Sequence, residues 1–289
     1  PHAPWVMGDA SAYPPGKIKL PAYLADTPMT RQQYADYLAE ITYMDSQVGE
    51  LLALLKETKN SDNTLVLFTS EQGAQFPGCK WTNWDNGLHT SLVARWPKKI
   101  ATGRTNAIVQ YADILPTILD LSGTKPNPKT FDGRSFAGVL LGKKSNHREH
   151  AFGMHNNYPE GPTYPIRSIT NGKWRYIRNL SHASLYIEKH LMGKHEHNPY
   201  WSSWVFSSFS NPKHEMLVNR FMKRPAEELY HTNEDPYELT NLASNPAHAT
   251  IKEMLATILD QHLKDQGDPG PSLDTQKAHK AAANLTPSF

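Results

Sequence analysis

The fold of this chain is indicated by one stretch, residues 64–73, which reads TLVLFTSEQG. Residues 64–69 form an unbroken apolar run rich in strand formers. A run without polar alternation is typical of a strand buried on both faces, as in a parallel sheet covered by helices. Ligands of open α/β sheets bind just beyond the carboxyl ends of strands, so we expect Glu71 and Gln72 at a functional site.

The elements around this stretch fit an α/β arrangement. Residues 31–56 place apolar side chains at helical spacing, which predicts a helix with one buried face. Thr27 or Thr30 is suited to cap its start. A second buried strand is expected at residues 92–96, and a short helix at 111–121.

Beyond about residue 131 the pattern of expected elements changes, and it predicts a smaller α+β unit. We therefore divide the chain into residues 1–135 and 136–289. The elements expected in the second part are a hairpin at 166–180 with a tight turn at Asn171-Gly172, a strand at 228–230, an amphipathic helix at 246–264 and a loose polar tail at 267–289.

Composition excludes several classes of protein. The 289 residues include 30 Lys and Arg and 28 Asp and Glu, a net charge of +2 that favours neither nucleic acid nor a membrane surface as partner. The one cysteine, Cys79, excludes an internal disulfide and a cysteine-rich zinc site. The chain contains no apolar run of about 18 residues, the length that a bilayer span needs.

An ordered set of motifs runs along most of the chain. The central motif is the strand ending in Ser70-Glu71-Gln72-Gly73, then Lys80, Gly87 and a strand ending in Trp96-Pro97. The other segments of the set are Pro1-His2-Ala3-Pro4 and residues 43–49, 113–117, 131–135, 227–230, 235–238 and 241–243. In this order the set resembles the sulfatase family. His155 and residues 164–168 look most similar to its heparan N-sulfatase (sulfamidase) branch.

The resemblance implies a fold and a division of the enzyme. Residues 1–135 would supply the C-terminal portion of an alkaline-phosphatase-like sheet with helices on both faces, its N-terminal part missing. Residues 136–289 would form a smaller α+β subdomain with an antiparallel sheet. The family's formylglycine nucleophile arises in a Cys/Ser-x-Pro-x-Arg motif, which Cys79 does not match. We therefore expect the formylglycine and the paired metal-binding aspartates upstream of Pro1. The resemblance also implies a secreted, periplasmic or lysosomal enzyme, and residues 1–289 contain no leader.

The resemblance also assigns roles in removing sulfate from a sulfated saccharide. Glu71 and Gln72 would bind Ca²⁺ or Mg²⁺ through oxygen, although the family usually has Asp followed by Asn or His. Lys80 would bind the sulfate, and His2 would protonate the leaving group. His155 and Arg167 would contact the substrate.

Structural alternatives stand beside these roles. Glu71 and Gln72 can form a plain polar turn, and Arg167 can be a structural arginine at the base of a hairpin. Four tryptophans can stack on sugars but are more often core residues: Trp81, Trp84, Trp201 and Trp204. Three histidines are interpreted as a solvated loop rather than a metal cluster: His190, His195 and His197.

Two other functions remain open. A phosphodiesterase or phosphonate hydrolase of the same superfamily would hold two metals with further Asp and His ligands, and the sequence shows no clear set of these. A non-catalytic saccharide-binding fragment would fit a chain without the nucleophile. We expect the chain alone to be inactive, with the N-terminal part of the same enzyme as its partner.

Overall fold

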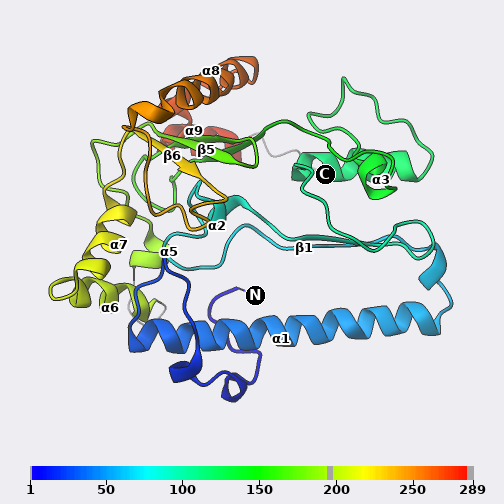
Figure 1. Ribbon diagram of the computed structural model, residues 1–289, viewed down its shortest axis with the longest axis horizontal. Helices are drawn as coiled ribbons and strands as arrows, with labels where there is room; N and C mark the ends of the chain where they lie inside the picture. Colours follow the sequence, from blue (N-terminus) through cyan, green and yellow to red (C-terminus); the bar gives the residue numbers. More distant parts are fainter. Residues whose placement is uncertain (1, 194–197, 285–289) are drawn as a thin grey trace.

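The computed structural model describes residues 2–193 and 198–284. A long helix, α1 (Pro28–Glu57), runs along one side of the molecule beside a two-stranded ribbon of β1 (Val66–Thr69) and β2 (Leu92–Arg95) (Figure 1). A four-stranded sheet lies at the other side, with α8 over it and α6 and α7 between it and α1 (Figure 1).

The helix α1 confirms the predicted helix and its cap. It begins at Pro28, and the Thr27 hydroxyl accepts a hydrogen bond from the Thr30 backbone N–H at 3.2 Å. Its predicted apolar face is only partly buried, because Leu51 remains 63% exposed in the second half of the helix. Leu54 in the same half is 55% exposed, so this stretch offers an apolar surface to further structure.

The ribbon of β1 and β2 corrects the expectation of buried parallel strands. The two strands are antiparallel, with Val66 opposite Arg95 and Thr69 opposite Leu92. Their residues are half-buried or exposed, and Val93 is 58% exposed. A continuous apolar run indicates that both faces can be covered, but it carries no information about the direction of the neighbouring strand.

The larger sheet is antiparallel throughout, with its strands in the order β3-β4-β5-β6. The predicted hairpin is β4 (Ile166–Thr170) and β5 (Trp174–Asn179), and Gly172 takes φ +83° in the turn between them. The predicted strand at 228–230 is β6 (Glu227–His231). The edge strand β3 (Ala151–His155) has no counterpart in the sequence prediction.

Several helices complete the chain. The predicted helices at 111–121 and 246–264 are each a 3-10 turn that continues into an α-helix. The part of the predicted loose tail that the structure describes, residues 267–284, is ordered, since Asp274 is fully buried and accepts the Tyr158 backbone N–H at 2.6 Å. The remaining bounds are α2 Asp85–Leu88, α3 Ile114–Leu121, α4 Ala137–Leu140, α5 Lys189–Met192, α6 Pro199–Ser208, α7 Pro212–Met222, α8 Ala249–Asp265 and α9 Gln276–Ala283, with 3-10 turns Ala10–Ala12, Pro15–Lys17, Ser61–Asn63, Tyr111–Asp113, Pro246–His248 and Gly270–Leu273.

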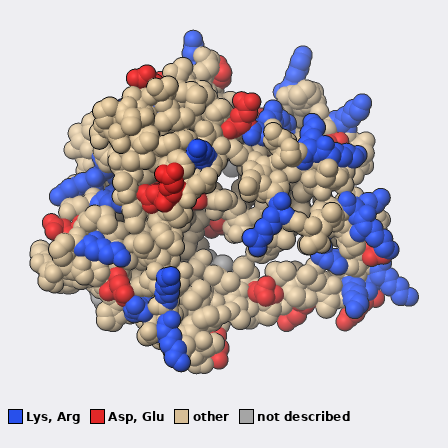
Figure 2. Space-filling model, viewed as in Figure 1, with Lys and Arg blue, Asp and Glu red and all other residues tan. Residues whose placement is uncertain are grey.

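Two apolar cores hold the described residues together. The smaller core packs α8 onto the four-stranded sheet around Tyr176 and Leu255. The larger core joins residues from both sides of the predicted boundary at 135/136, including Trp84 and Ile177, so that boundary stays a prediction. No helix in the described ranges has the length and apolar character to cross a membrane. Charge is distributed unevenly, with Lys and Arg gathered toward the side of the molecule that carries α3 (Figure 2).

Candidate active site

The candidate site is built on the loop between β1 and β2, and Gly73 lets this loop fold back on itself. Gly73 takes φ +48°, and a Cβ there would lie 2.6 Å from the backbone nitrogen of Lys80. The Lys80 N–H also donates to the Ala74 carbonyl at 3.1 Å. Any larger residue at position 73 would therefore push the start of the loop away from Lys80.

Aromatic packing fixes the middle of the loop. Phe76 is fully buried and stacks on Trp5 with 4.9 Å between ring centroids. The Tyr200 hydroxyl donates to the Gln75 carbonyl at 2.7 Å. Trp5 lies three residues after His2, so the Cα atom of His2 lies within about 11 Å of the Cα atom of Trp5.

Glu71 and Lys80 are brought together at the site. The Lys80 ammonium lies 3.2 and 3.1 Å from the two carboxylate oxygens of Glu71. Lys80 is largely buried, with 11% of its side chain exposed, whereas the Glu71 side chain is 62% exposed. The two side chains thus form an ion pair that is buried on the Lys80 side and open to solvent on the Glu71 side.

The residue after Lys80 has an unusual backbone. Trp81 takes φ +63°, a left-handed conformation that is rare for a bulky side chain. Its carbonyl accepts a 2.7 Å hydrogen bond from the buried hydroxyl of Tyr186. The same hydroxyl lies 3.4 Å from Nε2 of His155, so His155 and Lys80 belong to one neighbourhood. Burial, together with the charge of Arg224, lowers the pKa of His155 to about 4, which keeps its imidazole neutral near pH 7.

His190 corrects the interpretation of a solvated loop. It lies on α5, its ring stacks on Trp81 at 5.2 Å, and its Nε2 lies 2.5 Å from a carboxylate oxygen of Glu160. Glu160, Glu188 and His190 place one potential metal-ligand atom each within 4.8 Å of one another. Glu188, however, already accepts two backbone N–H groups of α5, and Lys189 pairs with Glu160 at 3.0 Å. His195 and His197 lie outside the described residues.

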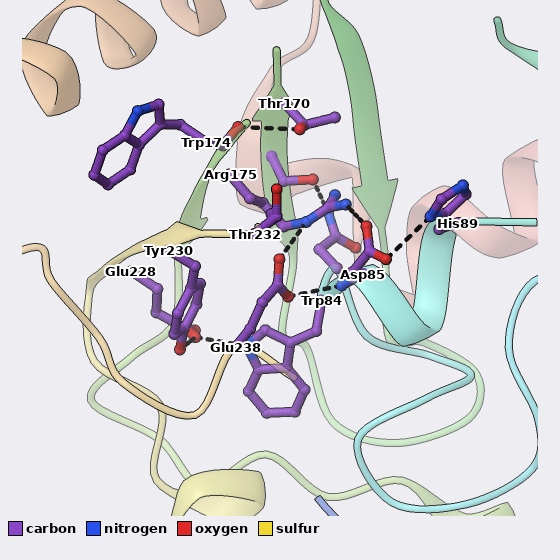
Figure 3. A network of polar contacts seen from close by, with 12 residues as sticks. Trp84, Asp85, His89, Thr170, Trp174, Arg175, Glu228, Tyr230, Thr232 and Glu238 are labelled. Carbon is purple, nitrogen blue, oxygen red and sulfur yellow. Dashed lines mark hydrogen bonds and ion pairs between the residues drawn. The ribbon is translucent and has the colours of Figure 1, made fainter. Parts of the chain in front are cut away.

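A polar network ties the end of the loop to the sheet (Figure 3). Arg175 of β5 donates to Glu238 at 2.7 Å and also pairs with Asp85 at the start of α2. The other oxygen of Glu238 accepts the Asp85 backbone N–H at 2.7 Å. His89 contacts Asp85 at 3.1 Å (Figure 3). Burial raises the pKa of Glu238 to about 7, against the opposing charge of Arg175.

Trp84 continues this network into the core (Figure 3). Its indole N–H donates to Glu228 at 2.7 Å, and the Arg220 guanidinium lies 3.5 Å from the centre of its rings. Trp84, Trp201 and Trp204 are all buried, which confirms the core alternative for these three. Cys79 is also buried, and burial raises the pKa of its thiol to about 12. A thiol in that state is an inert packing group.

The other predicted site residues lie apart from the Glu71–Lys80 pair. Arg167 is fully buried and pairs with Asp268, and it donates to the His155 carbonyl at 3.2 Å. This geometry favours a structural arginine over the predicted substrate contact, because its donors are turned inward. His2 is exposed, and its imidazole contacts the Ala3 carbonyl at 2.7 Å.

Glu71 and Gln72 fit part of a metal site. Both side chains are exposed at the end of β1 and offer hard oxygen donors. The two donors alone fall short of the six to eight oxygens that Ca²⁺ usually takes. The chemistry therefore fits a cation whose remaining ligands come from elsewhere.

Sequence reasoning missed the residues that support this site from a distance. Tyr186 and Arg175 contact residues about a hundred positions away in the chain. Glu188 accepts hydrogen bonds from the backbone at the start of α5. A buried polar residue in an apolar setting is a weak sequence signal. Glu228 and Glu238 lie in segments that match the family, but the sequence indicates no role for either residue.

Two family models match the chain. One described as Sulfatase matches residues 1–124, and one described as N-sulphoglucosamine sulphohydrolase, C-terminal, matches residues 79–195. Together they cover the Glu71–Lys80 loop, the strand β3 and the helix α5.

Comparison with individual proteins agrees with the family models. An ulvan-active sulfatase of Formosa agariphila is 34% identical over 81% of this chain and 44% of its own length. Human N-sulphoglucosamine sulphohydrolase is 27% identical over 89% of the chain and 53% of its own length. A solved structure of a protein in complex with its substrate D-glucosamine-2-N,6-O-disulfate shares the fold, with a TM-score of 0.59 and 21% identity over 85% of this chain and 43% of that one. The chain thus spans about half the length of the relatives it matches.

Proposed function

Because this chain belongs to the sulfatase family, we propose that it forms the C-terminal part of an enzyme that hydrolyses sulfate from a sulfated saccharide. The observation that carries the proposal is the Lys80 ammonium, which lies largely buried beside the carboxylate of Glu71 at the end of β1. A fixed cation in a partly desolvated site stabilises the negative oxygens of a sulfate group more strongly than a solvated lysine does.

Four candidate site residues have a defined role in this proposal. Glu71 and Gln72 supply oxygen ligands to a Ca²⁺ or Mg²⁺ ion, which stabilises charge on the sulfate when bound. The pair with Glu71 keeps Lys80 oriented, and Lys80 donates to a sulfate oxygen. His2 supplies a proton to the leaving oxygen or nitrogen of the saccharide.

A neutral imidazole at His155 suits contact with the sugar. His155 lies beside the Tyr186 hydroxyl. The same hydroxyl donates to the carbonyl of Trp81, the residue after Lys80. In the neutral state one ring nitrogen accepts and the other donates, which matches the hydroxyl groups of a saccharide. Arg167 stabilises the backbone at His155 by donating a hydrogen bond to its carbonyl.

We propose the N-terminal part of the same enzyme as the partner of this chain. It would bring the formylglycine, which supplies the nucleophile, and the remaining metal ligands. Two surfaces suit such a partner: the outer edges of the ribbon of β1 and β2, and the exposed second half of α1 around Leu51. Unpaired strand edges and an apolar helix face are stabilised when further structure covers them.

The substrate class follows from the relatives rather than from the fold. Of the two relatives named above, one is an ulvan-active sulfatase and the other is an N-sulphoglucosamine sulphohydrolase. A sulfated saccharide with O- or N-linked sulfate is therefore the proposed substrate. The enzyme would work in a secreted, periplasmic or lysosomal setting, where such polymers occur.

The test is release of inorganic sulfate by the complete enzyme from a disulfated glucosamine and from sulfated polysaccharide chains. The comparison substrate is a phosphonate monoester at the same concentration. Preference for the sulfated sugars is the expected result. Preference for the phosphonate would favour a phosphonate hydrolase, and turnover of neither would favour a non-catalytic saccharide-binding fragment.

A further inference from the structure

Charge in this chain is concentrated in one part, residues 95–150, which we call the basic lobe. It contains ten Lys and Arg and four Asp and Glu, a net charge of +6. The rest of the chain contains 20 Lys and Arg and 24 Asp and Glu, a net charge of −4. Figure 2 shows the basic side chains gathered over the side of the molecule that carries α3. A near-neutral chain therefore carries a strong local field.

Most of these cations have no carboxylate partner in the described ranges. Arg148 pairs with Asp113, and Lys98 pairs with Asp62. The other eight make no ion pair with any carboxylate in the described ranges, and all eight are exposed: Arg95, Lys99, Arg104, Lys125, Lys129, Arg134, Lys143 and Lys144. In the described structure this basic surface faces solvent.

The basic lobe also contains a hollow of about 460 Å³. Arg134, His147, Arg148 and His150 line it, against one carboxylate, Glu149. Such a lining favours an anionic group over a neutral one.

The floor of the hollow is rigid. Asp113 is fully buried and accepts from Arg148, from His147 at 3.1 Å and from the Arg134 backbone N–H at 2.8 Å. One buried carboxylate thus orients two of the lining side chains and the backbone of a third. This is a built arrangement rather than a chance gathering of surface lysines.

The hollow and the Lys80 site are connected by one strand. The lining reaches β3 at Phe152, and β3 ends at His155 beside the Tyr186 hydroxyl. Three residues of strand span about 10 Å. β3 is also the edge strand of its sheet, so a chain can lie along it from one end to the other.

From these observations we infer that the basic lobe is a second binding surface for the polymeric substrate, which holds flanking sulfate or carboxylate groups while Lys80 binds the group to be removed. The inference rests on the proposed function. A sulfated polysaccharide is favoured over nucleic acid because the lobe continues along β3 into the candidate site for sulfated sugar. The lobe would act on long chains and leave single sugars unaffected.

The test measures binding of the complete enzyme to heparin-type sulfated chains, to the same chains after desulfation, and to duplex DNA at equal concentration of charge. The test variant combines Arg134→Gln, Lys143→Gln and Lys144→Gln. The control combines Lys173→Gln, Lys213→Gln and Lys264→Gln, which removes the same charge from exposed lysines outside the lobe. Sulfate release from a disulfated monosaccharide is followed in parallel.

We expect the test variant to bind sulfated chains roughly 10- to 100-fold more weakly than the control, with the difference shrinking at high salt. Both variants should release sulfate from the monosaccharide like the parent. Equal affinity of the two variants for sulfated chains would overturn the inference, and so would parent binding to DNA as tight as to sulfated chains. Failure of the parent to release sulfate, with binding through the lobe intact, would count against the proposed function alone.

Discussion

The hydroxyl of Tyr186 donates a 2.7 Å hydrogen bond to the carbonyl of Trp81, the residue that follows Lys80. This bond joins two segments 105 residues apart and holds Trp81 in a left-handed conformation at φ +63°. Such a backbone costs about 1–2 kcal/mol unless the surroundings fix it. In the proposed enzyme, Tyr186 would therefore be a positioning residue, which acts on the sulfate through the direction it gives to Lys80.

Tyr186→Phe should therefore lower kcat about tenfold or more while leaving KM less affected, because a misdirected Lys80 stabilises the transition state poorly. The cost in stability should be only about 1 kcal/mol. The matched control is Tyr164→Phe, since the buried Tyr164 hydroxyl has no hydrogen-bond partner in the described structure. Equal losses of kcat in the two variants would show that the hydroxyl of Tyr186 only supports packing.

His2 and Lys80 should differ in their dependence on the leaving group. A sugar alcohol needs a proton as it departs, whereas nitrophenolate largely does not. His2→Ala should therefore reduce turnover of a sulfated saccharide by about 10²–10⁴-fold and turnover of nitrophenyl sulfate far less. Lys80→Ala should reduce both by similar factors, because both substrates share the sulfate.

The comparison of these two variants on the two substrates in the complete enzyme is decisive for both roles. If His2→Ala costs the same factor on each substrate, His2 is not the leaving-group acid. If Lys80→Ala spares either substrate, Lys80 does not touch the transferring group.

Glu71→Ala should weaken binding of Ca²⁺ or Mg²⁺ by roughly tenfold or more, with part of the lost activity restored by excess cation. The control is Glu57→Ala, which removes an exposed carboxylate at the end of α1. Titration calorimetry with each cation measures the affinities. Unchanged cation affinity in Glu71→Ala would show that Glu71 is not a metal ligand and only pairs with Lys80 in a polar turn.

Asp113 should make the protein sensitive to acid. Burial opposes its ionisation, but hydrogen bonds from Arg148 and from the backbone N–H groups of Arg134 and Gln110 outweigh burial and lower its pKa from 3.8 to about 2. A carboxyl with a depressed pKa stabilises the folded state at pH values above 3.8, and this contribution is lost as the pH falls toward 2.

Asp113→Asn should lower the free energy of unfolding at pH 7 by about 3–5 kcal/mol, because Arg148 loses its partner. The variant should also lose much of the parent's decline in stability between pH 4 and pH 2. Denaturant unfolding across this pH range measures both effects, with Asp120→Asn, an exposed carboxyl, as control. A parent and an Asp113→Asn variant with parallel stability profiles would contradict this role.

Much of the local structure was predictable from the sequence. Apolar periodicity located α1 and α8, and Asn171-Gly172 located the turn between β4 and β5, because these signals act over a few residues. The order of motifs placed Glu71 and Lys80 in one site, and they lie 3.1 Å apart. The helices α6 and α7 have no counterpart in the sequence prediction. The aromatic residues of α6 show little separation of polar and apolar faces. The helix α7 does bury one apolar face, with Leu217 and Phe221, and the sequence analysis missed it.

The sequence by itself determined which residues carry charge and oxygen donors after β1, and which family the motifs resemble. Only the tertiary structure decided the antiparallel pairing of β1 with β2, the inward turn of Arg167 and the hold of Tyr186 on Trp81. The physical reason is range. Helical periodicity and tight turns are fixed by neighbouring residues, whereas strand direction and buried hydrogen bonds depend on partners about twenty to a hundred residues away, which no local pattern specifies.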